Sequence, residues 1–188
     1  MKTPISDIAF TPTVKDIQQR LGSRETYERM ENNRDWQNRV TPELAAFIAE
    51  RDTFFLGTAN AEGQPYIQHR GGPPGFLKVL DEETLAFADF RGNRQYLTMG
   101  NLQDNDKAFI FLIDFANRRR IKVWGHASVI EDDHELLESL SDPEYKSKPE
   151  RVILFHIDAW DINCPQHITR RYTVEEFSTA FAGADAPG

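Results

Sequence analysis

Between Thr53 and Ile162 the sequence is a succession of short apolar segments, and this run limits the possible folds more than any other feature. Apolar residues that recur with a period of two are typical of a β-strand with one buried face. Such segments span residues 53–59, 65–70, 76–80, 84–90, 107–115, 120–130 and 151–162. Residues 60–64 supply Asn and Gly for a tight turn, so the first two segments form a hairpin. So many mostly antiparallel strands with few helices predict a mainly β (α+β) barrel, since closure of the sheet removes its edges.

Helices are expected mainly outside the strands. In an N-terminal arm, residues 1–40, Thr13 and Ser23 would cap two weakly amphipathic helices, which need the domain or a partner subunit to cover them. Further helices are expected from Thr41 to about Arg51, from Asn93 to about Leu102, over 131–140 as a crossover, and after Thr173, where a capping box starts a last helix with Phe177 and Phe181 inward. Residues 41–181 would form the main domain, and residues 182–188 a disordered tail.

The charge of the chain restricts its partners. The formal net charge is −8, and the only dense basic cluster lies at residues 118–122. Affinity for the nucleic-acid backbone needs a broad basic surface, so we expect no nucleic acid, and a local cluster suits a small anionic ligand better. No window approaches the roughly 18 apolar residues of a membrane span, no signal peptide is recognisable, and Cys164 is the single cysteine. These features indicate a cytoplasmic protein without a membrane partner.

The stretch 87–96, FADFRGNRQY, joins a strand to an expected helix and is the first candidate site. Asn93 is the natural N-cap, and Gly92 before it allows close approach of a ligand. Free backbone N–H groups at such a helix start, together with Arg91 and Arg94, offer hydrogen bonds to an anion. The stretch therefore favours a phosphate site, although a capped surface helix with two solvated arginines is the plainer interpretation.

Polar residues also share faces of two predicted strands. Tyr66, Gln68 and Arg70 alternate with Ile67 and His69 in the second hairpin strand. In the later strand, residues 120, 122, 124 and 126 supply Arg, Lys, Trp and His on one face, with apolar residues opposite. We expect the apolar sides to fill the barrel and the polar sides to face outward. A mixture of cations, amides and an aromatic ring suits a flat phosphorylated ligand, or alternatively a solvated face with salt bridges.

Common catalytic signatures are missing from the sequence. It contains no Walker A loop, GxGxxG, GxSxG, CxxC or HExxH motif, and the five histidines are scattered without the spacing of metal ligands. No metal site is therefore expected. Cys164 is interpreted as a small, partly buried side chain, because only local charge or exposure would make it a reactive thiolate.

Three motifs carry a resemblance to a known family: QHRGG at residues 68–72, GNRQY at 92–96 and CPQH at 164–167. With the strand order around them, the chain from about residue 41 to 172 resembles the pyridoxamine 5′-phosphate oxidase-like proteins, the FMN-binding split β-barrels. The resemblance implies a homodimer with FMN in a cleft between subunits. The residue patterns and the resemblance together give these candidate cofactor-binding residues: Gln68, His69, Arg70, Phe87, Ala88, Asn93, Arg94, Gln95, Arg120, Lys122, Gln166 and His167.

The resemblance implies an FMN-dependent oxidoreductase that acts on a small substrate. The chain lacks the family oxidase's C-terminal arginine and tryptophan segment, so vitamin B6 oxidation is not expected. Pro165 would stop the preceding strand and present Gln166 and His167 at the barrel rim, where His167 is the candidate proton donor or acceptor. A structural turn is the alternative there. A flavin or haem carrier or sensor without turnover is the alternative for the whole protein.

Overall fold

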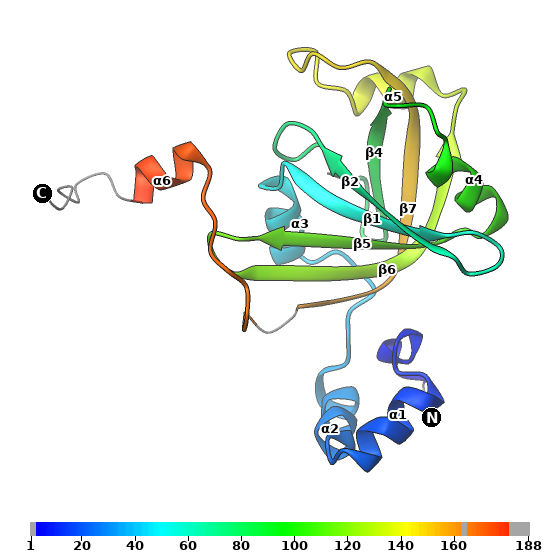
Figure 1. The fold of residues 1–188 in the computed structure, drawn as a ribbon, viewed down its shortest axis with the longest axis vertical. Coiled ribbons are helices and arrows are strands. Elements are labelled where there is room, and N and C mark those ends of the chain that lie inside the picture. The colour runs from blue at the N-terminus through cyan, green and yellow to red at the C-terminus, as the bar shows by residue number, and fades with distance from the viewer. Residues whose placement is uncertain (1–2, 163–164, 181–188) are drawn as a thin grey trace, which may run out of the picture.

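The computed structural model describes residues 3–162 and 165–180 (Figure 1). The N-terminal part contains a 3-10 helix, η1 (Ile5–Ile8), and three α-helices, α1 (Pro12–Arg20), α2 (Arg24–Arg34) and α3 (Pro42–Ala49). The strands are β1 (Thr53–Ala59), β2 (Pro65–Gly71), β3 (Lys78–Val79), β4 (Thr84–Phe90), β5 (Lys107–Asp114), β6 (Arg119–Ile130) and β7 (Pro149–Ile162). The remaining helices are α4 (Leu97–Asp104), α5 (His134–Ser139) and α6 (Val174–Ala180).

The described strands form one antiparallel sheet in the order β2-β1-β5-β6-β7-β4-β3. Figure 1 shows this sheet curving until β2, at one edge, lies near β4, which is next to the other edge. No ladder joins β2 to β4, and an ion pair between Arg70 of β2 and Asp89 of β4 spans the gap, which we call the split. The predicted α+β fold with a split β-barrel is confirmed.

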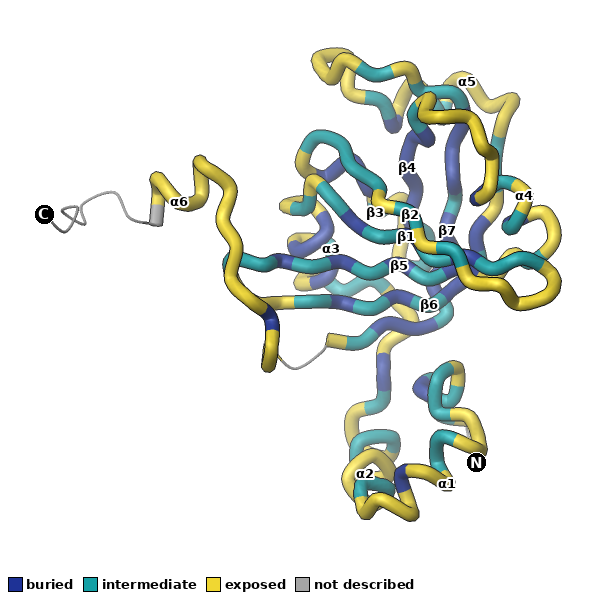
Figure 2. Tube along the Cα trace, viewed as in Figure 1, coloured by how far each residue is buried: buried dark blue, intermediate teal, exposed yellow. Residues whose placement is uncertain are grey.

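The core lies inside the curved sheet, where Figure 2 shows the buried parts of the strands. Inward-facing residues of β1, β5 and β6 are almost fully buried, as their alternating pattern predicts. The helix α3 buries Leu44, Phe47 and Ile48 against this core. Within the described ranges, no helix is long and apolar enough to cross a membrane.

Two predicted elements of the barrel are wrong in detail. The segment 76–80 pairs only at Lys78 and Val79, because Phe76 and Leu77 turn into the core from a loop and make no ladder. The helix α5 is not a crossover, because β6 and β7, which it connects, are antiparallel neighbours. It is therefore part of an ordinary connection between adjacent strands.

Two helices, α1 and α3, each begin at a threonine followed by a proline. The cap of α1 is Thr11, not Thr13, and its hydroxyl oxygen accepts a hydrogen bond of 3.3 Å from the N–H of Val14. Pro12 then occupies the first helical turn, where it loses no hydrogen bond. Thr41 caps α3 in the same way, as predicted, with the N–H of Leu44 as donor.

The last helix, α6, starts where predicted, but its aromatic side chain Phe177 is exposed. The Thr173 hydroxyl accepts from the N–H of Glu176, and the Glu176 carboxylate accepts from the N–H of Thr173, so the capping box is confirmed. Phe177 is 56% exposed, which contradicts its predicted inward position. Figure 1 shows why: α6 extends away from the barrel. Phe181 and the tail 182–188 lie outside the described residues.

Trp36 packs between the N-terminal segment and the barrel. Its ring stacks on Trp124 of β6 with centroids 4.6 Å apart, and Phe10 packs on it at 5.2 Å. Beside it, Gln37 forms a bridge to Trp160 of β7. The N-terminal helices are thus joined to the barrel by the Trp36 indole, which is 7% exposed, and by the bridge at Gln37.

Replacing Trp36 by alanine should release these helices without unfolding the barrel, because the stack with Trp124 is lost. We expect trypsin to cleave the variant faster at the exposed Arg20, Arg29 and Arg34, while the circular dichroism of the barrel is retained. Tyr27→Ala is the matched control, since Tyr27 contacts Phe10 at the edge of the same cluster. An unchanged cleavage rate for Trp36→Ala would show that the stack does not hold the helices.

Candidate functional site

The candidate site is a pocket at the split of the barrel. It is bordered by β2 on one side, by the ends of β4 and β7 on the other, and by the start of α4. Its lining residues are Tyr66, Gln68, Arg70, Asp89, Phe90, Gly92, Asn93, Arg94, Gln95, Tyr96, Leu97, Thr98, Met99, Glu150 and Arg151. Five of the sequence-predicted residues therefore lie together: Gln68, Arg70, Asn93, Arg94 and Gln95.

The polar face of β2 points the opposite way from the prediction. Leu56 of β1 pairs with Gln68, and Phe54 pairs with Arg70, and both apolar partners are fully buried. Paired residues of antiparallel strands share a face, so Gln68 and Arg70 lie on the inner face, at its open edge. Ile67, expected inside, is 69% exposed. An inward charge on an edge strand also discourages unwanted strand pairing.

A hydrogen-bond chain fixes the β2 side chains against α4 and β4. The Thr98 hydroxyl donates to Oε1 of Gln68 at 2.8 Å and accepts from Nη2 of Arg70 at 3.3 Å. Nη1 of Arg70 donates to the carboxylate of Asp89. The guanidinium is therefore held from two sides, while its Nε has no hydrogen-bond partner within the described part of the chain. That N–H is buried and lacks an acceptor among the described residues of the single chain.

The loop of residues 91–96 differs from the prediction, because the helix begins at Leu97 and not at Asn93. Asn93 Oδ1 accepts a hydrogen bond from the N–H of Gln95, a local turn that competes with helix formation. Arg94 and Tyr96 then take left-handed backbone conformations, with φ of 62° and 56°. Such conformations are uncommon in non-glycine residues and tend to cluster at functional sites.

Arg94 is the exposed cation of this loop that lines the pocket. Its Nε donates to the Tyr96 hydroxyl at 2.8 Å. That hydrogen bond raises the pKa of the Arg94 guanidinium above its usual value, so the group stays charged. In this position Arg94 faces solvent at the mouth of the pocket and offers its remaining N–H groups to an anion.

The third cation comes from β7. Arg151 lies 3.5 Å from Oδ2 of Asp89 through Nη1, so one carboxylate is shared by Arg70 and Arg151. Its Nη2 contacts Glu150 at 2.9 Å, and its guanidinium carbon lies 5.5 Å from the ring centroid of Tyr96. Three guanidinium groups and two carboxylates line the pocket, so its charge favours an anion.

The pocket is small. Its volume is about 60 Å³, far below the roughly 300 to 1,000 Å³ typical of sites that enclose a whole cofactor or drug-sized ligand. Within one chain, this space suits one charged group, such as a phosphate. The rest of a larger ligand would lie outside it.

Phe87, Ala88 and His69 lie beside the pocket and do not line it. Phe87 is 1% exposed, and the guanidinium carbon of Arg70 lies 5.5 Å from the centroid of its ring. Ala88 is also buried, in a separate cluster with Leu140. His69 is on the outer face of β2, with its Nε2 2.6 Å from the Thr53 hydroxyl. The side chains of these residues thus have structural contacts in this chain.

Arg120 and Lys122 lie on the outer face of β6, away from the split. Lys122 is 3.2 Å from Asp161 and lies near the rings of both Trp36 and Trp124. Arg120 is opposite Ile113 of β5. In the single chain, neither residue joins the candidate site.

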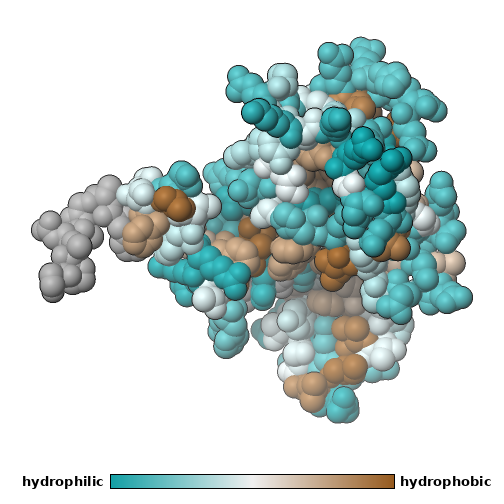
Figure 3. Space-filling model, turned by 45° about the horizontal axis from the view of Figure 1, so that its top comes forward, coloured by the Kyte–Doolittle hydropathy of each residue, from teal (hydrophilic) through white to brown (hydrophobic). Residues whose placement is uncertain are grey.

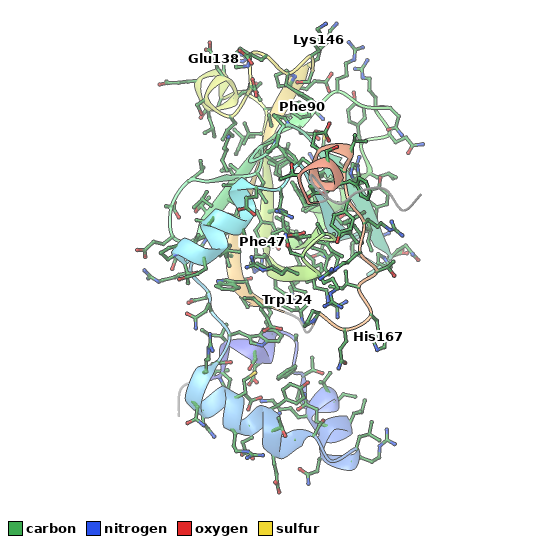
Figure 4. All side chains as sticks on the ribbon, turned by 90° about the vertical axis from the view of Figure 1, so that its left-hand side faces the viewer. Phe47, Phe90, Trp124, Glu138, Lys146 and His167 are labelled. Atoms are coloured by element: carbon green, nitrogen blue, oxygen red, sulfur yellow. The ribbon has the colours of Figure 1, made fainter. Side chains whose placement is uncertain are left out.

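Gln166 and His167 form an exposed turn beyond the end of β7. His167 has a left-handed φ of 62°, and the next residue, Ile168, is buried and anchors the turn. Figure 4 shows His167 at the opposite end of the barrel from Phe90, which lines the pocket. One chain does not bring this turn to the pocket. Cys164 lies outside the described residues.

Sequence reasoning missed Asp89, Thr98 and Arg151. Asp89 and Arg151 each had a usable signal, since each is a charged residue within an otherwise apolar strand segment. Thr98 had no such signal, because its role depends on how α4 packs against β2. Arg151 and Asp89 are paired across neighbouring strands, 62 positions apart in the sequence.

Together, these features define a split β-barrel protein with a pocket lined by three arginines and two carboxylates at the split. A family model described as pyridoxamine 5′-phosphate oxidase matches residues 40–164, so the chain belongs to that family. No curated protein matches the chain.

Two solved structures illustrate the shared fold. HupZ of Group A Streptococcus is 18% identical, with a TM-score of 0.55 over 71% of this chain and 99% of HupZ. An FMN-binding protein from Syntrophomonas wolfei is 15% identical, with a TM-score of 0.51 over 81% of this chain and 97% of that protein. Identities this low show a common fold and no more.

Proposed function

We propose that this protein binds FMN, with the phosphate in the pocket at the split, and that it is an oxidoreductase acting on a small substrate. The observation that carries the proposal is the phosphate-sized, cation-lined pocket in a barrel of this family. Binding of FMN by the Syntrophomonas wolfei protein of the same fold supports it.

The residues present fit the phosphate of FMN. Arg70 and Arg94 supply two guanidinium groups, and Arg70 keeps an unpartnered N–H. Charge-assisted hydrogen bonds from guanidinium to phosphate are among the strongest available to proteins. Bound FMN would accept or donate a pair of electrons as a hydride equivalent. The role of this chain is then to hold the phosphate, to orient the cofactor and to leave one face of it accessible.

The flavin ring cannot enter a pocket of about 60 Å³, so it would lie on the outer surface. We propose that a second copy of the chain covers it. The outer face of β1 and β5 carries half-exposed Phe55, Phe109, Phe111 and Ile113. Figure 3 shows apolar atoms gathered across the middle of the molecule, where these strands lie. A contiguous apolar patch on a barrel favours a self-complementary interface.

Replacing Phe111 by aspartate should convert the proposed homodimer into a monomer, because a charge would then be buried in the apolar interface. Sedimentation at micromolar concentration measures this directly. Leu80→Asp is the matched control, since Leu80 is 43% exposed but lies away from this face. A Phe111→Asp variant that sediments as the dimer would place the interface elsewhere.

The visible spectrum of the purified protein tests the cofactor. We expect the bands of oxidised flavin, either at purification or after incubation with FMN, and loss of these bands when a nicotinamide nucleotide is added. Flavin bands that persist after a nicotinamide nucleotide is added would indicate a flavin carrier or sensor, and a haem spectrum would show that the protein binds haem instead of flavin. Protein that stays colourless after incubation with FMN would contradict the proposed function.

A further inference from the structure

We propose that Arg151 is a further phosphate ligand, which acts from β7 across the split from Arg70. This inference rests on the proposed function, and it extends it to a residue that the family motifs of the sequence did not indicate. Arg151 lies at the start of a long apolar strand and is 9% exposed. A charged residue so deeply buried is costly unless its charge and hydrogen bonds are satisfied.

The hydrogen bonds of Arg151 are incomplete. Nη1 and Nη2 reach Asp89 and Glu150, but Nε has no hydrogen-bond partner in the described ranges. A carboxylate oxygen of Glu131 lies 3.9 Å from this Nε, which is beyond hydrogen-bond distance. Arg70 has the same deficit at its own Nε. Of the four arginines in the described ranges whose buried Nε lacks an acceptor, Arg70 and Arg151 are the two that line this pocket.

The charges around Arg151 also leave room for an anion. Asp89 is the one deeply buried carboxylate in the pocket, and both arginines share it. The carboxylate of Glu150 is more exposed, and it also lies 3.7 Å from Arg91. A phosphate that accepts hydrogen bonds from Arg70 and Arg151 would supply the missing negative charge and the missing acceptors together.

The topology gives this contact a structural consequence. Between β2, which holds Arg70, and β7, which holds Arg151, lie β1, β5 and β6 in the sheet order. A phosphate held by both arginines would join these two strands across the split. Because it binds the closed barrel and not the unfolded chain, the anion should raise the unfolding temperature.

Arg151→Lys tests the contact, since it keeps the positive charge but removes the planar guanidinium group and its Nε–H. We expect FMN to bind about threefold to tenfold more weakly, and riboflavin, which has no phosphate, to bind as in the wild type. Arg91→Ala is the matched control, because Arg91 approaches the same Glu150 without lining the pocket. Unchanged FMN affinity, or equal losses for FMN and riboflavin, would overturn the proposal.

Orthophosphate separates this inference from the proposed function. It should raise the unfolding temperature of the wild type and of Arg91→Ala, and raise that of Arg151→Lys less. If the wild type fails to bind FMN but shows this pattern, the cofactor assignment fails and the phosphate site stands. If Arg151→Lys does not fold, wild-type NMR decides: the Nε–H signals of Arg70 and Arg151 should shift with orthophosphate, and that of Arg24 should not. No shift at Arg151 would refute the contact.

Discussion

Replacing Gly125 by alanine is expected to lower the stability of the barrel by about 3 kcal/mol or more. A Cβ atom at this position would lie 1.9 Å from the carbonyl oxygen of His156 and 2.6 Å from Cε1 of Phe155. The first of these is a backbone atom of the neighbouring strand and cannot rotate away. The clash can be relieved only if β6 and β7 separate.

The position of Gly125 explains the size of the effect. The register between β6 and β7 shifts at Trp124 and Gly125, as at a β-bulge, and this pairing is the longest in the sheet. Separation of these strands would disturb both halves of the barrel. Chemical unfolding with urea, followed by circular dichroism, measures the loss.

Gly100→Ala is the control, because a Cβ there meets nothing within 4 Å. Gly100 lies inside α4 and is exposed, so alanine should stabilise the helix by up to about 1 kcal/mol. The two substitutions are chemically identical and should act in opposite directions. If Gly125→Ala changed the free energy of unfolding by less than 1 kcal/mol, the close approach of the two strands would be wrong.

The strands could be predicted because their pattern is local. The period-two alternation in β1, β5 and β6 located each strand to within one or two residues, and for β6 it also identified the inner face. The caps of α3 and α6 were equally readable, since a Thr-Pro pair and a capping box act within four residues. Strand alternation and helix caps depend on residues close together in the chain, so both can be recognised in the sequence.

The geometry of the split could not be predicted in this way. Alternation shows that Gln68 and Arg70 share a face, but not which face is the inner one. Here the usual rule reverses, because β2 is an edge strand whose inner face meets the split and not the closed core. The side chains that complete the pocket, Asp89 and Arg151, reach it through strand pairing between distant segments.

Asn93 shows the limit of a short motif. Glycine followed by asparagine before a helical pattern is a sound N-cap signal. In the structure, the Asn93 side chain accepts a hydrogen bond from the N–H of Gln95 and forms a local turn. The helix α4 starts four residues later, at Leu97. The anion-binding groups of this loop are consequently side chains such as Arg94, rather than the N–H groups of a helix start at Asn93.

Replacing Arg70 by alanine should weaken FMN binding about tenfold to a hundredfold, the loss expected for one charge-assisted contact worth about 1.5 to 3 kcal/mol. Riboflavin binding should change little, because it has no phosphate. Fluorescence titration of the flavin measures both affinities. Arg91→Ala again serves as a control, because it removes a guanidinium from the neighbouring loop but not from the pocket.

The comparison of FMN with riboflavin is needed because Arg70 has two roles. It lines the pocket, and its ion pair with Asp89 also spans the split. Loss of that span alone would loosen the whole site and weaken FMN and riboflavin equally. In Arg70→Ala, however, Asp89 keeps Arg151 as a partner from β7, so the carboxylate is not left unpaired. A loss confined to FMN therefore identifies a phosphate contact, whereas equal losses would make Arg70 a structural residue and remove the main support for the proposed cofactor.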